Sequence, residues 1–466
     1  MVVRTIFQHD GQLSLGEVEI QLLPGIPILH VVGLPDAHIR EFGLKFKSAL
    51  RASGYQWPKG HQIVVNLRPS HWRKSSSGVD LAITLGFLAL TGQLEETFKQ
   101  RVQEGVVYGE LTLDGHVHAP VDLAAARLVS ARTLITGELT VPVREGQWWT
   151  VKHLRQAEWE WSSRTFDWST YWQAPEFPNL DVHPAAARAL MLAVHMQLNV
   201  LVAGPQGSGK STWAKALYAL TPRPVPAEFI QTERLFGERC GSLRWRPFER
   251  PHHSITTQAM IGGGSPLQAG VISRAHGGVL VMDEFLEFEA QVLEALREPI
   301  ENGTIEHARC GEFVQFPARF QLIGTTNLCP CGRLNLENIG QGKPCSMSLI
   351  RCRSVCQRLS GPIMDRFDLL LLSNSWLKRS ETVSLASVRD QIERLAEFRE
   401  RRGEVSDTLP EWMNQLDLSF RRRNSMLKVA RALADLDQSI LIRGRHFQAA
   451  LDAVTHPMDA VRRLFA

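Results

Sequence analysis

The segment Gly204-Pro-Gln-Gly-Ser-Gly-Lys-Ser211 places glycines, a lysine and a hydroxyl at the spacing of a phosphate-binding loop. An apolar stretch precedes it and a helical stretch follows it. Glycines let backbone N–H groups approach phosphate oxygens, and the start of the helix adds the positive end of its dipole. Lys210 would neutralise the β- and γ-phosphates and Ser211 would ligate magnesium. The predicted nucleotide contacts here are Gly204, Pro205, Gln206, Gly207, Ser208, Gly209, Lys210, Ser211 and Thr212.

Two adjacent acids end a second apolar segment, Gly278-Val-Leu-Val-Met-Asp283-Glu284. Asp283 would hold magnesium through its water shell, and Glu284 would polarise an attacking water as a general base. Acids often end strands or begin helices, so the pair alone says little. A glycine-rich turn without function is likewise the alternative for the loop upstream. Their occurrence together predicts hydrolysis of ATP with Mg²⁺.

Two further polar positions adjoin predicted strands. Asn327 ends the segment Phe320-Gln-Leu-Ile-Gly-Thr-Thr-Asn327 and would lie near the γ-phosphate if that strand neighbours the other two. A plain turn at a strand end is the alternative. Arg366 precedes a predicted buried strand, where it could reach the ATP of an adjacent subunit and stabilise transition-state charge. An internal contact with Asp365 or Asp368 is the alternative for Arg366.

Alternating strands and helices must position these groups. In the first segment, residues 1–162, strand patterns cover 16–22, 28–32 and 62–66, and helical patterns cover 36–53 and 81–91. Two more strands flank Asp114-Gly115, a dipeptide favoured in tight hairpins. This alternation predicts a folded α/β domain.

The rest of the chain divides into three parts. Residues 148–178 are rich in tryptophan with little periodicity, and we interpret them as connecting chain whose aromatic side chains pack on a neighbouring domain. The linker between the two domains is placed at 163–180, and an aromatic nucleic-acid platform is the alternative. Residues 181–373 alternate strands and helices and hold the motifs, with a cysteine-rich insertion at 329–356. Residues 374–466 contain helical patterns at 383–402, 421–436 and 446–454 and no clear strand. They predict a small helical lid.

Composition restricts the class of protein. A chain of 466 residues with 44% hydrophobic and 21% charged residues indicates a soluble protein of two or three domains. No apolar run is long enough to span a membrane, and the N-terminus lacks a secretory signal pattern. The net charge of +4 permits nucleic-acid binding without arguing for it. Five of the seven cysteines lie between Cys329 and Cys356, which favours a reduced, cytoplasmic protein with a local metal or thiol site.

The adjacent residues His252 and His253 could suggest a metal site. Neighbouring residues in an extended chain point in opposite directions. We therefore expect a structural or loop role for this pair.

Taken together, the motifs resemble the AAA+ ATPases of the magnesium-chelatase type, and more closely their ComM/YifB branch. The resemblance extends beyond the ATP motifs and covers nearly the whole chain. It includes Arg246-Pro-Phe-Glu-Arg-Pro-His-His-Ser254, Gly262-Gly-Gly, Ile272-Ser-Arg-Ala-His-Gly-Gly278, Leu296-Arg-Glu-Pro-Ile-Glu301, Phe316-Pro-Ala-Arg-Phe320, Val31-Val-Gly-Leu-Pro35, Ala49-Leu-Arg-Ala-Ser-Gly54 and Asp80-Leu-Ala-Ile.

This resemblance implies roles for the motif residues. Asp283 and Glu284 would be the hydrolysis pair, Asn327 the sensor, and Arg366 an arginine finger acting on a neighbouring subunit. Arg421, in Leu418-Ser-Phe-Arg421, matches the lid arginine that senses the nucleotide. The family implies a hexameric ring, and ComM proteins are branch-migration helicases that act on DNA in natural transformation. Candidate pore loops are Met260-Ile261 and the turn Ala308-Arg-Cys-Gly311.

The resemblance extends to the first domain, which is similar to the Lon-type protease fold. Catalysis in that fold needs a serine activated by a lysine. The Ser-Ala-Gly pattern is missing around Lys74-Ser-Ser-Ser-Gly-Val-Asp80, and no lysine occupies the position of the base between Gly109 and Ala126. We expect no peptidase activity.

The cysteines have two interpretations. Many ComM-like chains carry two Cys-X-Cys pairs in this region, and zinc prefers four thiolates in a tetrahedron. This chain keeps Cys329, Cys331 and Cys345, and Met347 stands in the fourth position, so Cys352 or Cys356 would have to complete a structural zinc site. The alternative is a loop of reduced thiols, some buried as small apolar groups.

Two classes of function remain after this reasoning. The first is an ATP-driven motor that moves or remodels branched or single-stranded DNA, which is favoured by the ComM-like first domain. The second is a chelatase- or chaperone-type ATPase that remodels a protein partner.

Overall fold

The structure is a computed structural model of the whole chain that divides into two compact units. One is built mainly from Met1–Tyr171, and the other mainly from Trp172–Val225, Leu243–Ile305 and Pro317–Ala466. The residues it describes are 1–9, 12–32, 36–69, 78–120, 133–138, 146–155, 159–164, 172–224, 245–264, 267–309, 312–332, 358, 361–373, 376, 381–405, 407–416 and 418–463. Within this described part, no helix combines the length and apolar character needed to cross a membrane.

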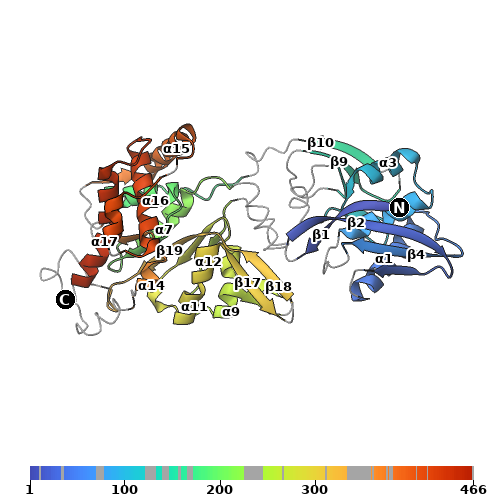
Figure 1. The fold of residues 1–466 in the computed structure, drawn as a ribbon, viewed down its shortest axis with the longest axis horizontal. Helices are drawn as coiled ribbons and strands as arrows, with labels where there is room; N and C mark the ends of the chain where they lie inside the picture. The colour runs from blue at the N-terminus through green and yellow to red at the C-terminus, as the bar shows by residue number, and fades with distance from the viewer. Residues whose placement is uncertain are drawn as a thin grey trace. The chain divides into compact units, whose positions relative to one another are not determined.

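An eight-stranded sheet organises the first unit, in the order β10-β9-β8-β5-β1-β2-β4-β3 (Figure 1). The antiparallel meander β1-β2-β4 continues into the parallel pairs β3·β4, β1·β5 and β5·β8. The strands are β1 Val2–His9, β2 Gln12–Pro24, β3 Leu29–Val32, β4 His61–Arg68, β5 Val106–Val107, β6 Glu110–Leu111, β7 Val117–His118, β8 Leu134–Thr136, β9 Gly146–Val151 and β10 Trp159–Arg164, and the helices are α1 Asp36–Ala52, α2 Val79–Leu90 and α3 Glu96–Glu104.

Alternation along the strands builds the core of this unit. In β4, Ile63, Val65 and Leu67 are fully buried while the residues between them keep some exposure. Their side chains pack with those of α1 and α2, such as Phe46 and Phe87, whose rings meet edge to face. The strand and helix positions predicted from the sequence in this segment agree with these elements.

The tryptophan-rich region differs from its interpretation as connecting chain. Residues 146–151 and 159–164 are the strands β9 and β10, paired in antiparallel register. Trp148 and Trp159 are buried in the core of the first unit. Trp148 and Trp159 bury large apolar side chains from these strands, which explains the composition better than a linker does.

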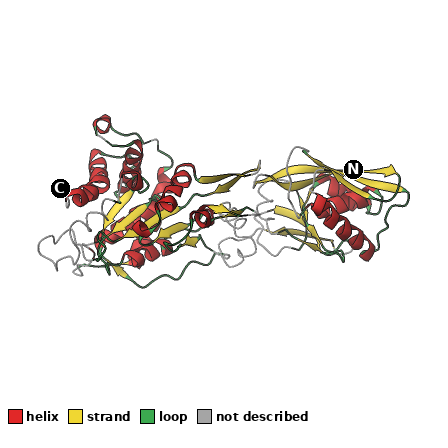
Figure 2. Ribbon diagram, turned by 90° about the horizontal axis from the view of Figure 1, so that it is seen from below, coloured by secondary structure: helices red, strands yellow, loops and turns green. Residues whose placement is uncertain are grey.

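A five-stranded parallel sheet, in the order β13-β16-β19-β12-β20, forms the centre of the second unit. Figure 2 shows helices lying against the strands of this unit. Its strands and short strand pairs are β11 Asp181–Val182, β12 Val200–Ala203, β13 Phe248–Glu249, β14 Gly262–Gly263, β15 Gln268–Ala269, β16 Val279–Met282, β19 Gln321–Thr326, β20 Leu369–Leu372 and β21 Val383–Ser384. Its helices are α6 Pro184–His195, α7 Lys210–Ala219, α9 Thr257–Ile261, α10 Val271–Arg274, η3 Phe285–Glu287, α11 Ala290–Ala295, α12 Arg297–Asn302, α14 Gly361–Met364, α15 Leu385–Arg402, η6 Glu411–Gln415, α16 Phe420–Leu436 and α17 Gly444–Arg463. The strand pair β17 Thr304–Arg309 and β18 Glu312–Pro317 belongs mostly to the first unit, which includes Glu306–Phe316.

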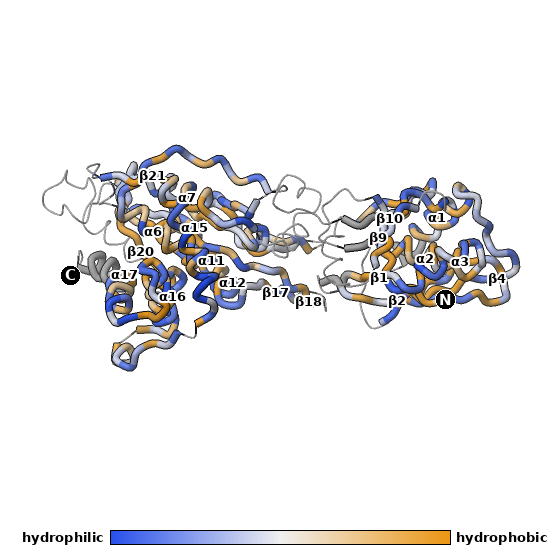
Figure 3. Tube along the Cα trace, turned by 90° about the horizontal axis from the view of Figure 1, so that it is seen from above, coloured by the Kyte–Doolittle hydropathy of each residue, from blue (hydrophilic) through white to orange (hydrophobic). Residues whose placement is uncertain are grey.

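Both faces of this sheet are covered. Val200 and Val202 of β12 pack with α6, α7 and the C-terminal helices, whereas Leu201 and Ala203 pack with α9 to α11. Strands buried on both faces read as continuous apolar runs, as β12, β16 and β20 do. The hydropathy colouring of Figure 3 separates this apolar interior from polar outer elements such as α12.

The C-terminal region is helical, in α15, α16 and α17, as the sequence predicted. One detail differs, because Val383–Ser384 forms the short strand β21 and pairs with β11. Two residues are too few for a pattern of period two to reveal a strand.

Candidate active site

The glycine-rich turn connects β12 to α7 at the carboxyl edge of the parallel sheet. Gly207 and Gly209 have φ of 78° and 86°, the left-handed region that side chains with a Cβ rarely adopt. Gly209 is the residue before the first turn of α7, which begins at Lys210. The local sequence therefore directs the backbone N–H groups of the turn and the start of α7 to one side of the sheet edge.

Lys210 points across the turn towards Asn327. Its Nζ donates to the carbonyl oxygens of Gly204 (3.0 Å) and Pro205 (2.8 Å) and to Oδ1 of Asn327 (3.0 Å). Partial burial lowers the pKa of Lys210, and the nearby carboxylates of Asp283 and Glu284 act in the opposite direction. A partly desolvated ammonium facing two carboxylates suits a ligand with several negative charges.

Asp283 lies at the end of β16, between the phosphate-binding turn and β19. Its Oδ1 accepts hydrogen bonds from Thr325 Oγ1 (2.9 Å) and Ser211 Oγ (3.4 Å). Its Oδ2 pairs with the guanidinium of Arg250. The hydroxyl and carboxylate predicted to ligate magnesium are therefore adjacent, and such oxygen donors fit Mg²⁺.

Glu284 follows Asp283 with an unusual backbone. Its φ of 54° and ψ of 46° are left-handed, and its N–H donates to Thr325 Oγ1 at 3.3 Å. The side chain is 60% exposed, and Oε2 lies 3.8 Å from Nδ1 of His253. A non-glycine residue held in this region suggests a functional constraint.

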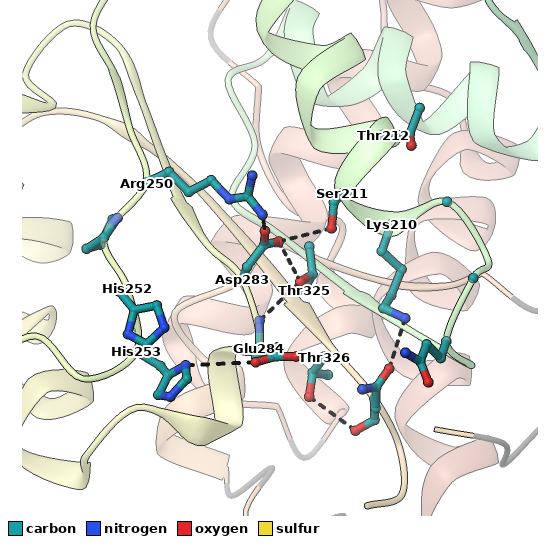
Figure 4. A pocket seen from close by; sticks show the side chains of 15 residues that line it. Lys210, Ser211, Thr212, Arg250, His252, His253, Asp283, Glu284, Thr325 and Thr326 are labelled. Carbon is teal, nitrogen blue, oxygen red and sulfur yellow. Dashed lines mark hydrogen bonds and ion pairs between the residues drawn. The ribbon is translucent and has the colours of Figure 1, made fainter. Parts of the chain in front are cut away.

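These side chains line one cavity of about 810 Å³, shown from close by in Figure 4. Its lining consists of Gln206, Gly207, Gly209, Lys210, Ser211, Thr212, Arg250, Pro251, His252, His253, Asp283, Glu284, Thr325, Thr326 and Asn327. The structure thus brings together most of the residues predicted for nucleotide binding and hydrolysis, including Asn327 from the third strand.

Three residues predicted as nucleotide contacts, Gly204, Pro205 and Ser208, are not among the described residues lining this cavity. Gly204 and Pro205 instead present their carbonyl oxygens to Lys210. Ser208 is buried, and its Oγ bonds to the carbonyl of Pro205 (2.8 Å) and to Ser373 Oγ (2.6 Å). These residues stabilise the conformation of the turn through hydrogen bonds on the side away from the cavity lining.

Sequence reasoning missed the wall formed by Arg250, His252 and His253. The expectation that the two histidines point in opposite directions was wrong, because their ring centroids lie 4.1 Å apart and both rings face the cavity. The wall follows β13, which has only two residues and gives no periodic signal. The signal in the sequence that could have indicated this wall is the close succession of an arginine and two histidines.

The two predicted arginines lie elsewhere in the second unit. Arg366 is buried, and its Nη2 pairs with Glu294 Oε2 of α11 at 3.0 Å, rather than with Asp365 or Asp368. Arg421, near the start of α16, pairs with Glu301 of α12. Neither arginine is among the described residues that line the cavity.

The described cysteines adjoin the phosphate-binding turn. Sγ of Cys329 and Sγ of Cys331 lie 3.2 Å apart, and the carbonyl of Gly332 accepts a hydrogen bond from the N–H of Gln206 at 2.7 Å. Cys345, Cys352 and Cys356 lie outside the described residues. Within the described ranges, no group of three or more His, Cys, Asp or Glu side chains could hold a metal ion.

One candidate pore loop needs correction. The Met260 side chain is fully buried against the helices of the second unit, so it is not available to a substrate. The other candidate lies at the β17–β18 turn, where Ala308 and Arg309 end β17, while Cys310 and Gly311 lie outside the described part.

Three family matches cover most of the chain. Residues 177–380 match "Magnesium chelatase, subunit ChlI", residues 18–145 match "Subunit ChlI of Mg-chelatase", and residues 378–453 match "Magnesium chelatase, subunit ChlI C-terminal". The first match contains the whole cavity.

Two bacterial proteins are similar to this chain over nearly their full length, and a plant protein is similar over part of it. The chain is 31% identical over 479 residues to the uncharacterized protein YifB of Escherichia coli K12, covering 93% of each chain. It is 31% identical over 492 residues to the competence protein ComM of Haemophilus influenzae, covering 94% of each. A probable DNA helicase MCM9 of rice is 28% identical over 216 residues, which is 46% of this chain and 26% of that protein.

Proposed function

This chain belongs to the magnesium-chelatase family of AAA+ proteins, in the branch of ComM and YifB, and we propose that it is an ATP-driven motor acting on branched DNA. The observation that carries the ATPase part is the convergence of Lys210, Asp283, Glu284 and Asn327 on one cavity. In this proposal the protein assembles as a hexameric ring in the cytoplasm.

The residues of the cavity fit ATP with Mg²⁺. Backbone N–H groups of the turn and Lys210 would bind the phosphates, and Ser211 and Asp283 would hold the metal, which shields phosphate charge. Glu284 accepts a proton from the attacking water. Asn327 fixes Lys210 through Oδ1, which leaves its amide N–H groups for the γ-phosphate or the water.

The C-terminal helices act as the lid in this proposal. Arg421 on α16 would report the nucleotide state, and its present partner Glu301 would release it when a nucleotide binds. Arg422 beside it donates to the carbonyl of Met364 (2.8 Å) and pairs with Asp365, in the segment that carries Arg366. A movement of α16 would therefore reach the predicted finger directly.

The first unit and the cysteines have supporting roles. We propose an inactive relative of the Lon-type protease fold for the first unit, because the serine–lysine pair is missing. A structural zinc at Cys329, Cys331, Cys345 and one of Cys352 or Cys356 would brace the turn that contacts Gln206.

DNA as the substrate rests on relatives. The Haemophilus protein is named for competence and the rice protein for helicase activity, which supports a role in natural transformation or recombination. The alternative is an ATPase of the same family that remodels a protein partner.

A forked DNA titration tests the proposal. We expect forked DNA to bind in the presence of ATP, more weakly at about 200 mM than at about 50 mM salt, because phosphate contacts release counterions. DNA should raise ATP turnover, and Lys210→Ala should abolish turnover because it removes the main charge on the phosphates. Turnover in Lys210→Ala equal to that of the wild type would contradict the site. A rate of ATP hydrolysis that forked DNA does not change at either salt concentration would favour a protein substrate.

A further inference from the structure

We infer that Asp368 is a positioning residue that couples Arg366 to the lid helix α16, an inference that rests on the proposed role of Arg366 as a finger. Asp368 lies two positions after Arg366 and directly before β20, and its side chain is 8% exposed. Its two carboxylate oxygens contact different parts of the second unit. Oδ2 accepts a hydrogen bond from the N–H of Asn199 at 2.9 Å, and Oδ1 accepts one from Ser425 Oγ of α16 at 2.7 Å. One buried side chain therefore joins the sheet, the segment of Arg366 and the lid.

Asn199, the residue before β12, fixes the backbone around Asp368. Its carbonyl accepts the N–H groups of Asp368 (2.8 Å) and Leu369 (3.1 Å), and its Nδ2 donates to the carbonyl of Arg366 (3.3 Å). Oδ1 of the same side chain accepts the N–H of Leu322 in β19 at 2.8 Å. The backbone at Arg366 is therefore fixed to β12 and β19, two of the strands whose other ends build the cavity.

Helix α16 contacts the chain on both sides of Arg366. Three polar residues at intervals of three, so that successive members are neighbours on the helix surface, make these contacts, namely Arg422, Ser425 and Lys428. Before Arg366, the carbonyl of Met364 accepts a hydrogen bond from Arg422 Nη2 at 2.8 Å. After it, Oδ1 of Asp368 lies 3.5 Å from Lys428 Nζ, in addition to its bond with the serine. A displacement of α16 therefore moves the segment of Arg366 with it.

Stability alone does not require this polar contact. The neighbouring residues Met426 and Val429 already bury α16 in the apolar core. A buried carboxylate costs free energy unless its hydrogen bonds are satisfied, and apolar residues of similar volume are often as stabilising as a buried ion pair. What the contact adds is a fixed relation between two arginines. Arg421 lies about one helical turn before Ser425, so a change at the predicted nucleotide sensor passes through α16 to Arg366.

The test removes only the contacts that α16 makes with Asp368. Replacing Asp368 itself would also leave the N–H before β12 without its acceptor, so the variants are Ser425→Ala and Ser425→Ala/Lys428→Ala. Ser439→Ala is the matched control, because Ser439 follows α16, is buried like Ser425 and donates a hydrogen bond of 2.8 Å to a backbone carbonyl. Both single variants should lower the melting temperature to a similar extent, since each loses one buried hydrogen bond.

Turnover should distinguish the two serines. We expect kcat to fall roughly tenfold in Ser425→Ala and further in the double variant, and to stay at the wild-type value in Ser439→Ala. A finger supplies about three or more orders of magnitude, and a misplacement of about 1 Å can cost about a hundredfold. The Kd for a non-hydrolysable MgATP analogue should stay within about twofold in all three variants, because the phosphate-binding turn is unchanged.

Two further measurements separate positioning from damage to the variant's own site. Once Arg366 is replaced by alanine, Ser425→Ala should change the residual rate by less than about twofold. Subunits with Lys210→Ala keep an intact Arg366, so an excess of them should raise the turnover per Ser425→Ala subunit to that of wild-type subunits mixed in the same ratio. A structural defect within the Ser425→Ala subunit would not be repaired by its neighbour.

Three results would overturn the inference. They are wild-type kcat in Ser425→Ala/Lys428→Ala, an equal fractional loss from Ser425→Ala in the wild-type and Arg366→Ala backgrounds, and a turnover per Ser425→Ala subunit that the Lys210→Ala subunits do not raise. Failure of the proposed function is seen separately, as full turnover in Lys210→Ala, and failure of the predicted finger as full turnover in Arg366→Ala.

Discussion

Glu284 combines an exposed carboxylate with a left-handed backbone, a conformation that costs on the order of 1 kcal/mol in a residue with a Cβ. Replacement by glutamine keeps the shape and backbone of this residue and removes the proton acceptor. We expect Glu284→Gln to bind ATP with near wild-type affinity and to hydrolyse it at least about a hundredfold more slowly. Equilibrium nucleotide binding together with single-turnover hydrolysis measures both. Loss of affinity would instead reveal a structural role.

Asp80, at the start of α2 in the first unit, makes a prediction about pH. Burial raises the pKa of Asp80 to about 7, with Lys45 acting against it and Glu110 and Glu41 adding to it. The folded state therefore keeps the Asp80 proton at pH values where the unfolded chain has lost it. Because the folded state binds more protons, the free energy of unfolding of the wild type falls as the pH rises towards 7. An asparagine at this position does not titrate, so the free energy of unfolding of Asp80→Asn relative to that of the wild type should rise by on the order of 2 kcal/mol from pH 5 to pH 8. Denaturant unfolding across that range measures the gain, and parallel curves for the two proteins would contradict it.

At the residue scale, the sequence predicted those side chains that follow long apolar strands or a glycine-rich turn. Lys210, Asp283 and Asn327 meet because the carboxyl ends of neighbouring parallel strands share one edge. His253 could not be placed, because its position depends on the pairing of β13 with β16. The partner of Arg366 was also beyond prediction, since Glu294 lies on a helix 72 positions earlier.

At the scale of elements, the segment after β19 passes directly over the phosphate-binding turn. Asn327 contacts Lys210, and five residues later Gly332 receives the N–H of Gln206. The intervening Cys329 is buried and lies beside Cys331. An interaction that holds the turn at Cys329 and Cys331 in place therefore also stabilises the phosphate-binding turn.

A zinc measurement tests what fixes it. We expect about one zinc per chain in protein purified under reducing conditions, and Cys329→Ser/Cys331→Ser should lose it, because two thiolates fewer leave an incomplete tetrahedron. Chelation should then weaken ATP binding through Gln206. Metal analysis without zinc, and unchanged stability with a chelator, would support reduced thiols instead.

The C-terminal helices are joined to α6 by a buried network around Asp435. Its carboxylate accepts hydrogen bonds from His195 Nε2 (2.8 Å), Arg431 Nε (3.0 Å) and Arg402 Nη2 (3.4 Å). Burial raises the pKa of Asp435, but the hydrogen bond from His195 and the charges of Arg431 and Arg402 outweigh it and hold the pKa below its ordinary value. The carboxylate is therefore charged, and it binds three elements together.

Asp435→Asn should weaken this junction. It removes the carboxylate that pairs with the buried Arg402 and one of the two that pair with the buried Arg431, whose other partner is Asp407. Breaking a buried ion pair by removing one partner typically costs about 3 kcal/mol or more. Thermal unfolding should shift down, whereas Asp452→Asn, at an exposed aspartate of α17, should leave it unchanged. Equal melting temperatures for Asp435→Asn and wild type would mean that apolar packing alone holds these helices.

For the whole molecule, sequence reasoning recovered the α/β class, the parallel sheet around the motifs and the helical C-terminus. Those features follow from local apolar periodicity and from the strand–turn–helix context of the loop. The strands at the tryptophan-rich segment were misread, because β9 and β10 pair across a stretch whose aromatic residues obscure the alternation. Contacts between subunits could not be predicted in this way, because they leave no periodic signal in a single sequence.

Arg366 is the residue through which the proposed assembly of subunits would affect ATP hydrolysis. Within one chain its guanidinium is 3% exposed and held by Glu294, whose pKa the hydrogen bond from Arg366 lowers. An arginine acting on a neighbouring nucleotide would have to exchange this partner when subunits meet. Hydrolysis should then rise more steeply than linearly with protein concentration until assembly saturates. Arg366→Ala should abolish turnover while ATP still binds through Lys210.

Mixed rings distinguish a finger from an internal brace. Combining Arg366→Ala with Lys210→Ala subunits creates some interfaces in which an intact loop meets an intact arginine. Because a finger typically adds about three or more orders of magnitude to turnover, even a few such interfaces should restore measurable hydrolysis. Glu294→Gln removes the internal partner alone and should remain active if Arg366 works across the interface. If co-assembled mixtures stay inactive, and Glu294→Gln fails as Arg366→Ala does, the ion pair between Arg366, which follows α14, and Glu294 of α11 is structural. The proposed ring would then need a catalytic cation from another residue.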